Sequence, residues 1–234
     1  MFKSVMLCIV LLGDGAFGLA ARIMSSWAAW PVAIAALVAV QYLEVTPPSL
    51  RQHDVDGHRE YVNHILNTGT IPGLLHGWET WHPPLYYLLA AGWKGLVPVS
   101  AGDDPFRSVQ MLGCALYLAT VFSALLVGRR LGLGGIALMA GMALLALMPG
   151  HLFYAARINS DVLLPVLGVG ITAATCAYAT SGDSRSLWAL ALLLPAALAT
   201  KMSSLAIFGG AMVVVVGSDI RRGQTWGAVA RRTY

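Results

Sequence analysis

The chain has 234 residues, of which 57% are hydrophobic and 11% charged, and its formal net charge is +4. Soluble domains carry about 25% charged residues, so this composition excludes an ordinary soluble domain and favours a polytopic membrane protein. The positive charge does not indicate a nucleic-acid partner. The arginines cluster in short loops between apolar runs, where they orient a chain in a membrane.

The first two apolar runs differ in how clearly they predict a transmembrane helix. Residues 5–21 are interrupted by Gly13-Asp14-Gly15 and fit a weak first span, an interfacial helix, a signal peptide or a mis-assigned start. Residues 27–45 predict a firm span, with aromatic residues near both ends, as in interfacial belts. The string Thr46-Pro47-Pro48 stops that helix, because proline lacks a backbone donor and restricts the residue before it.

Further apolar runs follow a long polar segment. The run at 84–98 is short for a span and predicts a helix lying in the membrane interface. Three spans are expected at 108–128, 133–149 and 162–180. Residues 187–217 would reach roughly 46 Å as one helix, too far for a single crossing. We therefore expect two short spans that turn near Lys201.

Charge predicts the orientation. Arg129-Arg130 and the arginines after Asp219 are expected to be cytoplasmic. Alternation then places Lys201, the 150–161 segment and a large loop at 46–106 on the outer face, provided that 84–98 does not cross. The predicted fold is a single all-α domain over residues 1–234, a polytopic transmembrane helix bundle whose outer loop carries juxtamembrane helices. The predicted location is a bacterial inner membrane, with membrane lipids as partners.

Two carboxylates open the helix that we predict at 55–67. Asp54 or Asp56 can cap this helix by accepting bonds from its free amides. Alternatively, Asp54 acts as a general base or a metal ligand. Asp54, His58 and Tyr61 fall on one helix face at i, i+4 and i+7, which brings a carboxylate, an imidazole and a phenol together.

A divalent metal is a further possibility, so any cofactor stays unassigned. His53, His58 and His64 together with the two aspartates supply zinc or manganese ligand types. No HExxH pattern or paired CxxC supports such a centre, and no metal ligand is assigned.

The most distinctive string is Trp81-His82-Pro83-Pro84-Leu85-Tyr86-Tyr87. Two consecutive prolines favour an extended segment that leads into the next helix. This arrangement predicts that His82 is held at the membrane edge. An alternative is that the string is an aromatic interfacial anchor, which Trp81, Tyr86 and Tyr87 would serve.

A second polar patch lies between the spans at 133–149 and 162–180. Within it, Arg157 can hold a phosphate by charge-assisted hydrogen bonds. Asp161 opens the following span and alternatively caps it with Arg157 as its partner. Lys201 stands in an apolar run, where it is either a snorkelling anchor or a phosphate contact.

The order of these motifs resembles the GT-C glycosyltransferases, in particular bacterial relatives of the protein O-mannosyltransferases and of the lipid A aminoarabinose transferase. The resemblance covers roughly residues 27–218 and rests on the following strings: Asp54-Val-Asp-Gly-His58-Arg-Glu-Tyr61, Gly69-Thr-Ile-Pro72, His82 to Tyr87, Arg107, the Gly-Arg-Arg-Leu-Gly at 128–132, Pro149, Tyr154 with Arg157 and Asp161, and Thr200-Lys201. Two departures are a valine after Asp54, where an acid is common, and fewer spans than family members carry. The resemblance therefore implies that the chain is incomplete at its C-terminus.

The resemblance implies transfer of a sugar from a polyprenyl-phosphate donor to an acceptor, a protein, lipid or glycan, on the outer face. Asp54 matches the family's catalytic acid, with Asp56 as the alternative and His58 beside it. The substrate-binding residues implied are Tyr61, His82, Arg157, Asp161 and Lys201. Two rival functions are a membrane transporter fragment and a non-catalytic subunit of a glycosylation assembly.

Overall fold

The computed structural model describes residues 29–46 and 54–223, and every regular element in this part of the chain is helical, as predicted. The α-helices are α3 (Ala29–Val45), α5 (Val55–Thr68), α6 (Leu85–Leu96), α7 (Arg107–Arg130), α8 (Gly135–Leu147), α9 (Pro149–Ala155), α10 (Leu163–Ser181), α11 (Ser184–Leu198) and α12 (Leu205–Arg221). Two short 3-10 turns lie at Ser160–Val162 and Met202–Ser204. The prediction for residues 5–21 and the ligand candidate His53 lie outside the described residues.

Three helical stretches are long and apolar enough to cross a membrane, namely Arg107–Arg130, Ser160–Ser181 and Met202–Arg221. The pair formed by α8 and α9 would be a fourth span, bent by 50°. Helix α8 covers only 13 residues of the span expected at 133–149, and it is long enough to cross a membrane only together with α9. Pro149 is the first residue of α9, and a proline there has no backbone N–H with which to continue α8.

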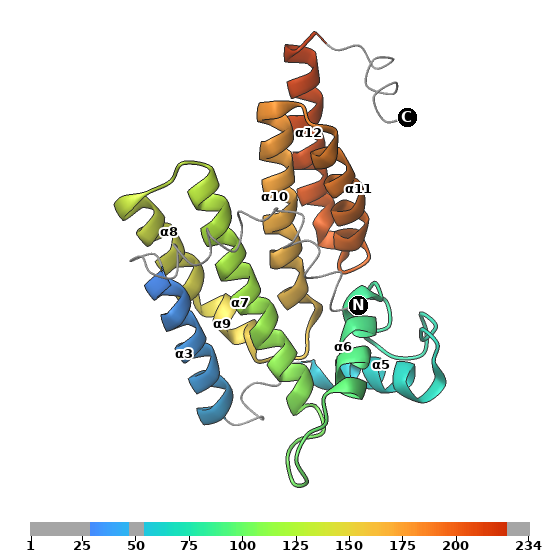
Figure 1. Cartoon of the computed structure of the whole chain (residues 1–234). Helices are drawn as coiled ribbons and strands as arrows, with labels where there is room; N and C mark the ends of the chain where they lie inside the picture. Colours follow the sequence, from blue (N-terminus) through green and yellow to red (C-terminus); the bar gives the residue numbers. More distant parts are fainter. Residues whose placement is uncertain (1–28, 47–53, 224–234) are drawn as a thin grey trace.

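The long helices form two groups that meet at α7 and α10 (Figure 1). The first group contains α3, α7 and α8, and the second contains α10, α11 and α12. Each group has its own cluster of buried apolar side chains. The connections alternate between the two ends of the bundle, so that polar segments far apart in the sequence come together.

We call the two ends of the bundle the site end and the opposite end. The site end, lower in Figure 1, contains α5, α6, α9 and both 3-10 turns. The opposite end contains the α7–α8 and α10–α11 connections and the last residues of α12. The break expected near Lys201 is confirmed, because α11 ends at Leu198 and α12 begins at Leu205.

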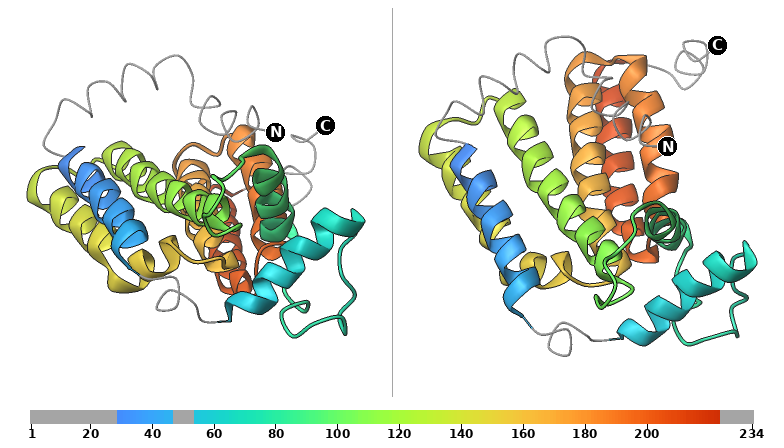
Figure 2. Two further views of the ribbon diagram at one scale, coloured as in Figure 1. Left: turned by 90° about the horizontal axis from the view of Figure 1, so that it is seen from below. Right: turned by 60° about the horizontal axis from the view of Figure 1, so that its bottom comes forward.

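Helix α6 has 12 residues, too few to span about 30 Å of hydrocarbon. Figure 2 shows α6 nearly end-on in its right-hand view, where α7 and α10 are seen from the side, so α6 is inclined steeply to the bundle. Its first amide, that of Leu85, donates to the Ala199 carbonyl at 2.8 Å. This bond joins the start of α6 to the turn before Lys201, and it draws His82 and Lys201 toward each other.

Candidate functional site

Asp54 is the first residue of the candidate site along the chain, and its backbone conformation is unusual. It is the one non-glycine residue with positive φ in the described chain, at φ 58° and ψ 14°. Aspartate tolerates this left-handed conformation better than most residues. Although Asp54 precedes α5 in the N-cap position, its side chain forms no capping hydrogen bond, so the capping interpretation is wrong for Asp54. The carboxylate is exposed at the entrance of α5.

Helix α5 buries the face that the spacing predicted. His58 and Tyr61 are almost fully buried, and both rings lie against Tyr87 of α6. The His58 Nδ1 lies 2.7 Å from the Tyr87 hydroxyl, and the Tyr61 and Tyr87 rings stack at a centroid distance of 3.8 Å. Helix α5 ends where Gly69 takes a left-handed conformation and its N–H donates to the Ile65 carbonyl.

Asp56 lies away from this buried face. It is exposed in the first turn of α5 and makes no hydrogen bond or ion pair with another described residue. There its charge favours the helix through the macrodipole. Asp54 and Asp56 therefore differ in backbone conformation and in their position relative to the buried face of α5.

The tyrosines of the His-Pro-Pro string are not an interfacial anchor. Tyr86 and Tyr87 have no exposed surface, whereas Trp81 is more than half exposed. The Tyr86 hydroxyl accepts a hydrogen bond from the Asn159 backbone N–H at 3.1 Å. Tyr86 thereby ties α6 to the second polar patch, and Tyr87 ties α6 to α5.

Glu79 completes the cluster, although it is not among the site residues predicted from the sequence. It is 5% exposed, and its Oε2 lies 2.7 Å from His82 Nε2 and 3.9 Å from His58 Nδ1. Gly57 makes room for it, since a Cβ there would lie 2.5 Å from Glu79 Cγ. The available signal was a carboxylate three residues before His82.

Burial controls the charge of this cluster. It lowers the pKa of His58 to about 4, with a further lowering by the nearby His82. Burial also raises the pKa of Glu79 and lowers the pKa of His82, which lies within the field of Lys201. Both shifts favour the uncharged forms of Glu79 and His82.

A second group of side chains comes from the loops before α10 and α12. Lys201 and Asp161 form an ion pair, and each is only partly exposed. Asn159 caps the 3-10 turn, since its Oδ1 accepts from the Asp161 N–H at 2.9 Å. The expected alternative, in which Asp161 is the cap and Arg157 its partner, is therefore wrong.

Arg157 is buried beneath aromatic rings. Its guanidinium carbon lies 3.3 Å from the Phe153 ring centroid, and the side chain is 7% exposed. Burial lowers the pKa of Arg157, while the field of Asp54 is among those that oppose the shift. Among the described residues its buried Nε has no hydrogen-bond partner.

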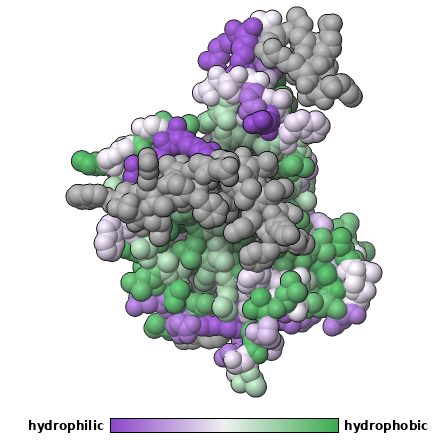
Figure 3. All heavy atoms as spheres, viewed as in Figure 1, coloured by the Kyte–Doolittle hydropathy of each residue, from purple (hydrophilic) through white to green (hydrophobic). Residues whose placement is uncertain are grey.

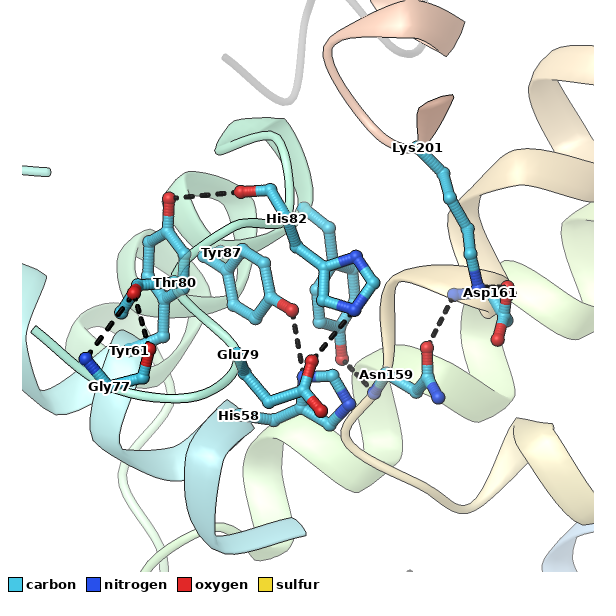
Figure 4. A network of polar contacts seen from close by, with 11 residues as sticks. His58, Tyr61, Gly77, Glu79, Thr80, His82, Tyr87, Asn159, Asp161 and Lys201 are labelled. Carbon is cyan, nitrogen blue, oxygen red and sulfur yellow. Dashed lines mark hydrogen bonds and ion pairs between the residues drawn. The ribbon is translucent and has the colours of Figure 1, made fainter. Parts of the chain in front are cut away.

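Figure 4 shows the two groups side by side, with the His82 ring on the side of the cluster that faces Lys201. The field of Lys201 acts on His58, Glu79 and His82. The field of Asp54 acts on His58, Glu79 and Arg157. All eight predicted site residues thus lie at the site end of the bundle, and Asp56 differs from the others in facing away from the buried face of α5.

The alternative metal ligands are not brought together in the described chain. His64 is outside the buried cluster, where its ring meets that of His76 at a centroid distance of 4.6 Å. Among residues 29–46 and 54–223, no group of three or more histidine, cysteine or acidic side chains can hold a metal ion. The arrangement offers acid–base chemistry beside fixed cations.

Comparison with known protein families, with curated proteins and with solved structures finds no match to this chain. The chemistry of the site and the motif pattern therefore carry the functional proposal.

Proposed function

We propose that this chain is a membrane glycosyltransferase of the GT-C type, which moves a sugar from a polyprenyl-phosphate donor to an acceptor at the outer face of a bacterial inner membrane. The main support is one juxtaposition. A carboxylate and imidazole cluster on α5 and the 79–82 turn lies beside the cation Lys201, and Arg157 lies within the field of Asp54. Phosphate departure and proton removal need these two kinds of group together.

The proposal places the site at the membrane surface. Helices α5 and α6 are then juxtamembrane helices of the outer loop at 46–106, and the opposite end faces the cytoplasm. Arg129 and Arg130 at the end of α7 favour this orientation. A donor with a polyprenyl tail would lie in the bilayer and present its phosphate at the level of the site.

In the reaction, the acceptor hydroxyl oxygen attacks the anomeric carbon while the bond from that carbon to the phosphate oxygen breaks. The bonding electrons leave with the phosphate, whose added charge Lys201 and Arg157 offset. Lys201 has three N–H donors, so a phosphate can share its ammonium with Asp161. Asp54 takes the acceptor proton, because it is exposed and its field reaches the buried cluster.

The remaining residues position these groups. His82 is held by Glu79 on one side and stacked by Trp81 on the other, so its ring can orient the donor phosphate or the acid. His58 and Tyr61 fix α5 against α6 through Tyr87. Asp161 holds Lys201 in place before the donor arrives.

The test is donor binding followed by thermal unfolding in detergent. The probe is a short-chain polyprenyl-phosphate mannose, compared with the same prenyl alcohol without phosphate or sugar. We expect the phosphate probe to raise the apparent melting temperature of the native chain, since a ligand of the folded state stabilises it. The shift should persist in Asp54→Asn and disappear in Lys201→Ala.

The native chain and Lys201→Arg serve as controls for folding and charge. An equal shift with the prenyl alcohol would mean that only the tail binds, and it would overturn the phosphate site. Absence of any shift in the native chain would count against the transferase proposal. Saturable vesicle uptake that depends on Asp54 would instead favour a transporter.

A further inference from the structure

The loop from Thr70 to Trp78 exposes an unusual amount of apolar surface. The segment TIPGLLHGW contains no charged residue. Leu75 is fully exposed, Leu74 is 73% exposed and Trp78 is 61% exposed, and Ile71 contributes a further half-exposed side chain. Such an apolar surface on a connection between two helices indicates a contact with a nonpolar partner.

The loop is held in this shape by its own contacts. The Thr80 hydroxyl lies 3.0 Å from the Leu74 carbonyl and 2.6 Å from the Gly77 carbonyl. The indole edge of Trp78 rests on Gly57 of α5, where a Cβ would lie 2.6 Å from its Nε1. The structure therefore presents Leu74 and Leu75 outward on a folded turn.

The position of the loop points to lipid as the partner. Helix α5 and the loop project sideways from the bundle in both figures, and Figure 1 shows them level with the lower parts of α3 and α7. Figure 3 shows a largely hydrophobic surface at the lower right, where this lobe lies. Helix α7 has 24 residues and is about 36 Å long, whereas α11 has 15 residues and is about 22 Å long. Helix α6 lies below α11 in Figure 1.

We propose that residues 71–78 insert into the lipid leaflet at the site end, with Leu74 and Leu75 among the acyl chains and Trp78 at the headgroup level. Tryptophan prefers that level, and the uncharged loop can enter it without burying an ion. This contact anchors α5 and the turn that carries Glu79 at a fixed depth. It rests on the membrane-spanning bundle and holds whether or not the chain transfers a sugar.

The 98–105 loop provides a matched contrast at the same end of the bundle. It carries Asp103 and Asp104, and Ser100 is exposed. We expect this loop to lie in water. The two loops differ in apolar character while they share the same end of the fold, so a depth measurement can compare them within one protein.

The experiment places a fluorescent NBD group on Leu75→Cys or on Ser100→Cys. Both are made in a chain whose Cys8, Cys114 and Cys176 are alanine, reconstituted at low protein density in phosphatidylcholine and phosphatidylglycerol nanodiscs. Lipids spin-labelled at a shallow or a deep acyl position are the membrane quenchers, and iodide is the aqueous quencher. Brominated-lipid quenching of the native-cysteine chain, with and without Trp78→Phe, repeats the test without changing a cysteine.

We expect NBD at residue 75 to be blue-shifted, protected from iodide and quenched most by the shallow spin label. At residue 100 it should be quenched by iodide alone. Trp78→Phe should lower the lipid-quenchable part of the tryptophan emission. Equal iodide quenching at residues 75 and 100 would overturn the proposal. Protection from both iodide and lipid quenchers would also overturn it, since protein would then cover the loop.

Discussion

The two ends of the bundle use polar side chains in different ways. At the opposite end, the Tyr178 hydroxyl donates to Asp219 at 2.5 Å. The Arg222 guanidinium donates to the carbonyls of Tyr178 and Ala179 at 2.5 and 2.8 Å. These bonds cap the end of α10 and fasten it to α12. Their partners are backbone groups or neighbouring side chains, as expected for a structural clamp.

At the site end, several buried polar atoms lack a hydrogen-bond partner among the described residues. They include Glu79 Oε2, His82 Nδ1, Arg157 Nε, Ser160 Oγ and Ser204 Oγ. A buried polar group without a partner costs about 1 to 3 kcal/mol. At the opposite end Arg222 Nη1 also lacks a hydrogen-bond partner among the described residues, but there Arg222 Nη2 donates to two backbone carbonyls, whereas the unpartnered atoms of the site end lie among the candidate ligand-binding residues. We therefore expect substitutions at the site end to affect activity and those at the opposite end to affect stability.

The largest expected effect is on transfer rate in Asp54→Asn. A general base contributes roughly 10²- to 10⁴-fold to rate, so transfer from the donor probe should fall by about that factor. Asparagine also tolerates positive φ, so the melting temperature should stay nearly unchanged. The matched control is Asp56→Asn, two residues further along on the exposed side of α5. An equal loss in both variants would contradict the assignment of Asp54.

The next effect is the pH dependence of stability at His58. Its folded pKa of about 4 lies below the ordinary value of 6.5, so the unfolded chain binds the proton first as pH falls. The stabilisation is complete above pH 6.5 and is lost as pH falls toward 4. The window is worth on the order of 3 kcal/mol, at 1.36 kcal/mol per pKa unit.

Detergent unfolding between pH 4 and 8 measures this effect as the difference between the native chain and His58→Gln. The comparison is needed because the raised pKa of Glu79 acts with the opposite sign, so that its stabilisation is lost as pH rises through the folded value. His64→Gln is the control, since His64 lies outside the buried cluster. Parallel pH profiles for native and His58→Gln would refute the predicted effect.

A smaller effect is expected from Asp219→Asn at the opposite end. This change weakens the bond from Tyr178 and leaves Arg222 without its carboxylate, and hydrogen bonds to charged groups contribute about 1.5 to 3 kcal/mol. Stability should fall by about that amount while transfer per folded molecule stays constant. Tyr178→Phe should cost about 1 kcal/mol. A loss of specific activity would mean that the two ends are coupled.

Local signals predicted much of the fold. Gly69 ended α5, the prolines at 83 and 84 preceded α6, and the polar interruption at Lys201 divided the last apolar run. Each of these signals acts through the backbone of a few neighbouring residues, so spacing alone revealed it. The span expected at 133–149 likewise ended at Pro149, and the bend between α8 and α9 lies at that residue.

The contacts of the candidate site depended on segments that meet only in three dimensions. The Lys201–Asp161 pair requires the bond from Leu85 to Ala199 and the contact from Asn159 to Tyr86, which join three separate parts of the chain. Glu79 joins the cluster only because Gly57 lets its loop approach α5. The residue type of Asp54 permits a left-handed backbone but does not require one, so the sequence did not reveal it.

The smallest expected effect compares one capping residue at each end. Asn159 caps the turn that carries Asp161, and Asp183 caps α11 by accepting from the Arg185 N–H at 2.7 Å. Replacing either by alanine should cost about 1 kcal/mol of stability, since both caps satisfy one free amide.

Only Asn159→Ala should also weaken the thermal shift produced by the donor probe, because the lost cap loosens the carboxylate that positions Lys201. Asp183→Ala should retain the full shift at an equal loss of stability. If both variants keep it, the Asn159 cap is structural and Lys201 is positioned by other contacts. If both variants lose the thermal shift, donor binding follows global stability, and the proposed functional difference between the two ends is wrong.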